Sequence, residues 1–152
     1  MSILTDSKTD KVADLIAKFH PEPIRKLLVV GCGDGTEAAI LAQRLSSSVT
    51  GVDLRRDFDA VALGYCDLKT GDATSLEFGP GEFDFVFSYH ALEHIEDPLK
   101  ALDEMKRVLG PGGGFWIGTP NKSRLLGYIG GKNTSFAEKV RWNVADWRMR
   151  LQ

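Results

Sequence analysis

Three glycines, Gly31, Gly33 and Gly35, lie between an apolar run and a segment of strong helix formers. Glycines in that setting allow a tight turn and let the backbone approach a ligand closely. The helix that follows would point its unpaired N–H groups and the positive end of its dipole at the same ligand. Asp53 ends the next apolar segment, where a carboxylate can accept hydrogen bonds from both hydroxyls of a ribose. Together these residues predict a site for a ligand that contains a nucleoside.

Two classes of ligand fit this pattern: a dinucleotide, and a nucleoside without phosphate. The dinucleotide motif GxGxxG has its third glycine where this chain has Thr36, so a nicotinamide-dependent oxidoreductase fits poorly. Asp72, in the segment TGDATSLEF, could accept a hydrogen bond from an adenine amino group. The alternative for both Asp53 and Asp72 is an ordinary turn or strand-end residue.

His90 follows the apolar segment 83–88 and is the best candidate for a proton acceptor, because imidazole titrates near neutral pH. The alternative is a histidine that packs or caps a helix, which is what we expect of His94. The three histidines and two cysteines lack the spacing of metal ligands, so the sequence predicts no metal site.

The segments that would hold these residues alternate between strand and helix patterns. Strands are expected at 26–30, 49–54, 66–72, 83–88 and 114–119, and helices at 8–19, from Thr36 and from Pro98. Asp97 has the side chain of an N-cap, and Pro98 suits the first helical position. This alternation predicts an α/β fold with a parallel sheet.

Apolar stripes predict which faces of two helices are buried. The stripe of the first helix consists of Val12, Leu15, Ile16 and Phe19. The stripe of the helix after Pro98 consists of Leu99, Leu102, Met105 and Leu109.

The composition excludes several classes of protein. The chain has 152 residues, and residues 1–120 hold 12 basic against 19 acidic side chains, which argues against nucleic-acid binding. No uncharged apolar run is long enough for a transmembrane helix, and the first residues lack the pattern of a signal peptide. Two cysteines are too few for a disulfide framework, so we expect a cytoplasmic protein with reduced thiols.

Four segments resemble the class I S-adenosylmethionine-dependent methyltransferases: LLVVGCGDGTEA, VTGVDL, TGDATSLEF and FDFVFSYHALEHIEDPLKALDEMKRVLGPGGGFWIGTPN. The last resembles the small-molecule branch that includes quinone-biosynthesis enzymes. The resemblance implies a Rossmann-like, doubly wound sheet in the order 3-2-1-4-5 within residues 1–120. It also implies methyl transfer by in-line displacement from S-adenosylmethionine to a small-molecule acceptor, with S-adenosylhomocysteine as the product.

The resemblance also assigns roles to individual residues. Those expected to contact the cofactor are Gly31, Cys32, Gly33, Gly35, Asp53, Leu54, Asp72, Ala73 and Ser88. The glycine loop would line the methionine part, Asp53 would bind the ribose, and Leu54 would pack on the adenine. Asp72 would hold the edge of the adenine. Tyr89 and His90 are the candidate catalytic residues.

The sequence departs from the family pattern in three places. Val29 stands where the family has an acidic residue, the link between Asp53 and Cys66 is short, and strands six and seven are missing after Thr119. Residues 121–152 hold 7 basic against 2 acidic side chains and are expected to form a Gly-rich linker and a C-terminal helix of the same domain. We expect the chain either to self-associate through region 114–151 or to leave part of its linker, 121–135, poorly ordered. These departures leave open an alternative function: a cofactor-binding but catalytically incompetent domain, truncated or regulatory.

Overall fold

Five parallel strands form one sheet in the computed structural model, which describes residues 4–20 and 22–119. The strands are β1 (Lys26–Val30), β2 (Ser48–Asp53), β3 (Asp67–Thr70), β4 (Phe83–Tyr89) and β5 (Leu109–Gly118). They pair in the order β3-β2-β1-β4-β5, which confirms the predicted fold and strand order. The predicted linker, final helix and missing strands lie outside the described residues, and so does most of the segment expected to mediate self-association.

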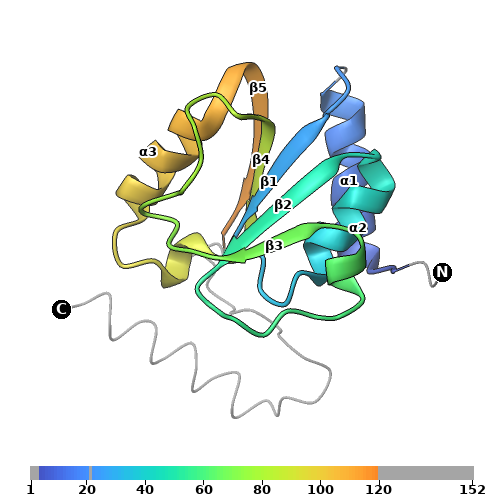
Figure 1. The fold of residues 1–152 in the computed structure, drawn as a ribbon. Coiled ribbons are helices and arrows are strands. Elements are labelled where there is room, and N and C mark those ends of the chain that lie inside the picture. The colour runs from blue at the N-terminus through green and yellow to red at the C-terminus, as the bar shows by residue number, and fades with distance from the viewer. Residues whose placement is uncertain (1–3, 21, 120–152) are drawn as a thin grey trace, which may run out of the picture. The chain divides into compact units, whose positions relative to one another are not determined.

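Helices from different parts of the chain cover the two faces of the sheet. They are α1 (Ser7–Phe19), α2 (Thr36–Leu45) and α3 (Pro98–Val108), with short 3-10 helices η1 (Ala62–Gly64) and η2 (Leu92–His94). Figure 1 shows α1 and α2 on one side of the sheet and α3 on the other. None of the described helices is long and apolar enough to cross a membrane.

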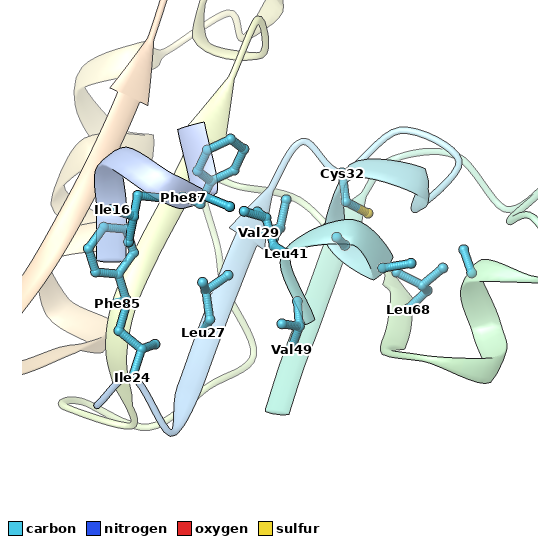
Figure 2. Packing of buried hydrophobic residues seen from close by; sticks show 14 residues of the cluster. Ile16, Ile24, Leu27, Val29, Cys32, Leu41, Val49, Leu68, Phe85 and Phe87 are labelled. Atoms are coloured by element: carbon cyan, nitrogen blue, oxygen red, sulfur yellow. The ribbon is translucent and has the colours of Figure 1, made fainter. Parts of the chain in front are cut away.

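β1 is buried on both faces, which explains its uninterrupted apolar sequence. Leu27 and Val29 pack in a cluster with α1 and α2, which Figure 2 shows from close by. Leu28 and Val30 pack in a second cluster with α3. The sheet is therefore the middle of three layers, and its strand ends are available for a site.

α1 forms where it was predicted, and Val12 and Ile16 of the predicted stripe pack in the core, but the other two residues of the stripe do not. Its N-cap is Asp6, whose Oδ2 accepts a hydrogen bond from the Thr9 N–H at 3.0 Å. Its buried residues are Thr9, Ala13 and Ile16. Leu15 and Phe19, from the predicted stripe, are 40% and 72% exposed. Small side chains let the helix approach its neighbours closely, which a stripe of the largest apolar residues does not capture.

α3 begins with the predicted cap, in which Asp97 accepts from the Lys100 N–H at 3.0 Å and Pro98 occupies the first turn. Its buried residues are Ala101, Met105 and Val108, whereas Leu99 is exposed. β5 starts at Leu109 rather than at position 114, because the Gly-Pro-Gly segment joins the strand with an irregular register instead of forming a separate turn.

Candidate functional site

A cavity of about 970 Å³ opens at the carboxyl ends of β1, β2, β3 and β4. At this edge β1 lies between β2 and β4, and the order of the strands reverses. Ligands of parallel α/β sheets bind at this kind of switch point. The predicted site residues that line the cavity are Gly31, Gly33, Asp53, Leu54, Asp72, Ala73 and His90. The predicted site residues outside its lining are Cys32, Gly35, Ser88 and Tyr89.

The three glycines after β1 have different surroundings. A Cβ on Gly31 would collide with the side chain of Ala91, and one on Gly35 would collide with Leu68. Gly33 has a φ of +58°, and no atom lies within 4 Å of the place its Cβ would take. All three glycines have a positive φ, but packing against Ala91 excludes a Cβ at Gly31, whereas Gly33 presents bare backbone to the cavity.

Asp53 shapes the glycine loop as well as facing the cavity. Its Oδ2 accepts a hydrogen bond from the Gly33 N–H at 2.8 Å, and its Oδ1 accepts from the Arg55 N–H at 3.0 Å. Each carboxylate oxygen has two lone pairs, so acceptor capacity remains for the hydroxyls of a ribose. The carbonyl of Val52 also accepts from the Gly31 and Cys32 N–H groups at 2.8 and 3.1 Å, which ties the loop to the end of β2.

Asp72 forms a turn at the end of β3 and lines the cavity at the same time. Its Oδ1 accepts from the N–H and the hydroxyl of Thr74 at 2.8 and 2.9 Å, and these hydrogen bonds lower the pKa of Asp72. The side chain of Leu54 is 74% exposed beside the cavity and offers an apolar surface for a flat ring. The turn and the predicted ligand contact are thus compatible.

The segment that follows Asp72 in the chain is attached to α3 by a charged network. Arg107 donates to the carbonyls of Phe78 and Leu76 at 2.7 and 2.9 Å, and Glu104 accepts from the Leu76 N–H at 2.8 Å. Glu104 and Arg107 also form an ion pair at 2.7 Å, and the hydrogen bonds from Arg107 lower the pKa of Glu104.

Cys32, Ser88 and Tyr89 contribute no lining to the cavity. The Cys32 side chain lies among the buried hydrophobic residues (Figure 2), and burial together with the nearby Asp53 charge raises its pKa to about 12. Ser88 is buried, and its Oγ has no hydrogen-bond partner among the described residues. The Tyr89 ring lies edge-on to the His90 ring, with 4.2 Å between their centroids. Side-chain roles toward a ligand are therefore concentrated in the other predicted residues.

His90 lines the cavity directly after β4 in an unusual backbone conformation, with a φ of +53°. Its N–H donates to the carbonyl of Gly118 at 2.8 Å, which attaches this residue to β5. Its Nδ1 lies 3.2 Å from Oε1 of Glu93. The imidazole is therefore fixed at the strand end, at the switch point of the sheet.

Sequence reasoning missed one side of the cavity. The residues there are His94, Ile95, Glu96, Asp97 and Lys100. The predicted helix start at Asp97-Pro98 could have indicated this side of the cavity. A helix that follows a strand of a parallel sheet begins at the carboxyl edge of the sheet. With Asp53, Asp72, Glu96 and Asp97 against Lys100, the lining carries more carboxylates than cations, which favours a cationic ligand.

Comparison with known proteins shows a match to a family model described as a methyltransferase domain, over residues 28–117. The ubiquinone biosynthesis O-methyltransferase of Pseudomonas aeruginosa is 35% identical over 118 residues, which cover 70% of this chain and 50% of that protein. The ajmaline N-methyltransferase of Rauvolfia serpentina is 30% identical over 108 residues, covering 63% and 37%. The chain spans half or less of the length of these relatives.

Two solved structures share the fold. The (4+2)-cyclase SpnF is 25% identical with a TM-score of 0.67, and the match covers 90% of this chain and 56% of that one. A putative S-adenosyl-L-methionine-dependent methyltransferase from Methanococcus maripaludis is 22% identical with a TM-score of 0.68, covering 93% and 66%.

Proposed function

The chain belongs to the methyltransferase domain family, and from this premise we propose that it binds S-adenosylmethionine and transfers the methyl group to a small-molecule acceptor. The observation that carries the proposal is the pairing of Gly33 with Asp53 at the switch-point cavity. It places bare backbone and a carboxylate side by side, where a nucleoside with a charged tail would need them. The cytoplasmic location expected from the sequence is part of the same proposal.

The cavity residues fit this cofactor. The space beside Gly33 admits a ligand against the backbone, and Asp53 has acceptor capacity for the ribose hydroxyls. Leu54 offers an apolar face and Asp72 an acceptor, as an adenine requires. The excess of carboxylates in the lining suits the positive charge of the sulfonium.

Bound S-adenosylmethionine would supply a methyl group on a positively charged sulfur, which becomes neutral on transfer. The residues of this chain would hold the reacting groups in line and limit the access of water. Val29 is buried in the core and brings no carboxylate to the cofactor's amino group, so backbone carbonyls at the strand ends would bind it. His90 would accept the proton of the acceptor.

The alternative expected from the sequence is a catalytically incompetent domain. Its support came from Val29 and from features that lie outside the described residues. The relatives that are named O- and N-methyltransferases favour the enzyme. Because a protein named as a cyclase shares the fold, the fold alone does not assign the reaction. The decisive test must therefore detect methyl transfer itself.

The test incubates the chain with S-adenosylmethionine carrying a deuterated methyl group and a panel of phenols, catechols and amines. We expect mass spectrometry to find S-adenosylhomocysteine and a labelled acceptor in equal amounts. Asp53→Ala should reduce both products, and Asp103→Ala, which removes an exposed carboxylate outside the cavity lining, should reduce neither. If calorimetry detects binding of neither S-adenosylmethionine nor S-adenosylhomocysteine, the proposal is wrong.

A further inference from the structure

Glu93 is a largely buried acidic residue beside the cavity with no role in the function proposed above. It lies in η2, and its side chain is only 13% exposed. Its Oε1 is 3.2 Å from Nδ1 of His90, and its Oε2 is buried without a hydrogen-bond partner among the described residues. A buried carboxylate with so few partners is costly unless a hydrogen-bond donor or a positive charge faces it. The His90 imidazole is the group in contact that can provide both.

The backbone around His90 keeps the imidazole beside Glu93. The φ of +53° is rare for any residue other than glycine, and such a conformation persists only where the surroundings enforce it. The hydrogen bond from the His90 N–H to Gly118 and the edge-on ring of Tyr89 supply that enforcement. The short spacing from His90 to Glu93 then brings the carboxylate to the imidazole.

We propose that Glu93 is a positioning residue, which accepts a hydrogen bond from the Nδ1–H of His90 and so makes Nε2 the nitrogen that takes the acceptor's proton. An ionised carboxylate can only accept, so contact with Nδ1 selects the tautomer that carries its proton there. The inference rests on the proposed methyl transfer and applies to an acceptor that loses a proton, such as a hydroxyl group.

The proton and electrons balance within this arrangement. The O–H bond of the acceptor breaks, its proton goes to Nε2, and the oxygen's electron pair forms the bond to the methyl group. The electron pair of the former methyl–sulfur bond stays on the departing sulfur. The imidazolium that results lies against the Glu93 carboxylate, so the half-buried pair becomes neutral overall.

Glu37, in the first turn of α2, is the second carboxylate near His90. It accepts from the Thr9 hydroxyl at 3.4 Å; burial raises the pKa of Glu37, and the charge of His90 opposes that rise. Glu37 accepts this hydrogen bond from α1, whereas Glu93 contacts the ring nitrogen of His90. Removal of Glu93 should therefore change the imidazole more than removal of Glu37.

Long-range proton–nitrogen NMR correlations of the imidazoles test the pairing without any acceptor. His20 is an internal reference for the same tautomer, since its Nδ1 lies 2.9 Å from the carbonyl of Glu22, which can only accept. In alkaline buffer, where imidazoles are neutral, we expect His90 to carry its proton on Nδ1, as His20 does. Glu93→Leu should move His90 toward the Nε2–H form and leave His20 unchanged. The proposal is overturned if His90 is in the Nε2–H form in the parent, if Glu93→Leu leaves it unchanged, or if Glu37→Gln changes it more.

Kinetics with a hydroxyl acceptor found in the deuterium experiment provide the second test. Glu93→Gln, which nearly preserves shape, should lower kcat about 100-fold with little change in S-adenosylhomocysteine affinity, and Glu93→Asp should restore part of the loss. Glu77→Gln removes an exposed glutamate outside the cavity lining and should leave kcat unchanged. An unchanged kcat in Glu93→Gln would overturn the role of Glu93. If no acceptor is methylated at all, the proposed function fails, and the NMR result still decides the pairing.

Discussion

The two halves of the cavity are built in different ways. On the side of β1 and β2, main-chain N–H groups of the glycine loop donate to the Asp53 carboxylate and to the Val52 carbonyl. On the side that follows β4, the same cavity is lined by the side chains of His90, His94 and Lys100. Main-chain geometry needs only glycines and a carboxylate at fixed positions, so the first half can recur in many proteins. The second half depends on side-chain identity, and we expect selectivity for the acceptor to reside there.

The largest effect is expected on the free energy of unfolding, from a substitution in the glycine loop of the first half. Gly31→Ala places a methyl group against Ala91 at a φ of +76°, and overpacking plus left-handed strain should cost about 3 kcal/mol of unfolding free energy. Gly33→Ala meets no neighbouring atom and should cost only about 1 kcal/mol, yet its methyl group should weaken the binding of S-adenosylhomocysteine. Urea unfolding and calorimetry measure the two quantities. Equal unfolding free energies in the two variants would contradict the distinction between these glycines.

A substitution in the second half of the cavity should lower turnover rather than cofactor affinity. His90→Ala should lower turnover by about 100-fold while the affinity for S-adenosylhomocysteine stays within about twofold, because His90 serves the acceptor and not the cofactor. Steady-state kinetics and calorimetry on the same preparation separate these effects. A parallel loss of affinity would mean that the two halves are not distinct.

Asp53→Ala tests the contact between cofactor and main chain. The variant loses an acceptor for the ribose and also the acceptor of the Gly33 N–H, so affinity should fall about tenfold or more. Calorimetry measures the loss, with Asp103→Ala as the matched control. An unchanged affinity with the fold intact would remove Asp53 from the site.

The smallest effect concerns the segment that follows Asp72, which Glu104 and Arg107 attach to α3. The pKa of Glu104 is lowered from its ordinary 4.5 in the folded chain, mainly by hydrogen bonds from Arg107. A lowered pKa gives stability that is fully present above the ordinary value and is lost as the pH falls through the folded value. The parent should therefore lose more thermal stability on acidification than Glu104→Gln does. Thermal unfolding at neutral and acidic pH checks this, and identical losses would contradict it.

The fold could be predicted because its signals are local. The apolar run at 26–30, the glycines that follow it and the Asp97-Pro98 helix start each depend on a few adjacent residues, and all three lie where they were expected. Helix faces were harder to predict, because burial depends on how closely a helix approaches the sheet. Phe19 and Leu99 are exposed for this reason, although their spacing predicts burial.

The candidate site was predicted more fully in its first half than in its second, where His90 is the predicted site residue that lines the cavity. Asp53 and Asp72 line the cavity as expected, because strand ends meet at one edge of a parallel sheet. Cys32 packs in the core and the Ser88 side chain is buried, so neither side chain lines the cavity, and the contact expected from the Ser88 backbone stays a prediction. The contact between His90 and Glu93 depends on the positive φ of His90, which no local sequence pattern predicts.

The rates at which the two cysteines react would report on local opening of the structure around the sheet. Burial raises the pKa of Cys32 to about 12 and of the partly buried Cys66 to about 11, and alkylation of the buried Cys32 requires the chain to open locally. Cys66 should be labelled first and Cys32 only when the glycine loop lifts from the core. A bound nucleoside that holds this loop would delay the second event alone. The ratio of the two labelling rates would then measure occupancy of the site even before a methyl acceptor is known.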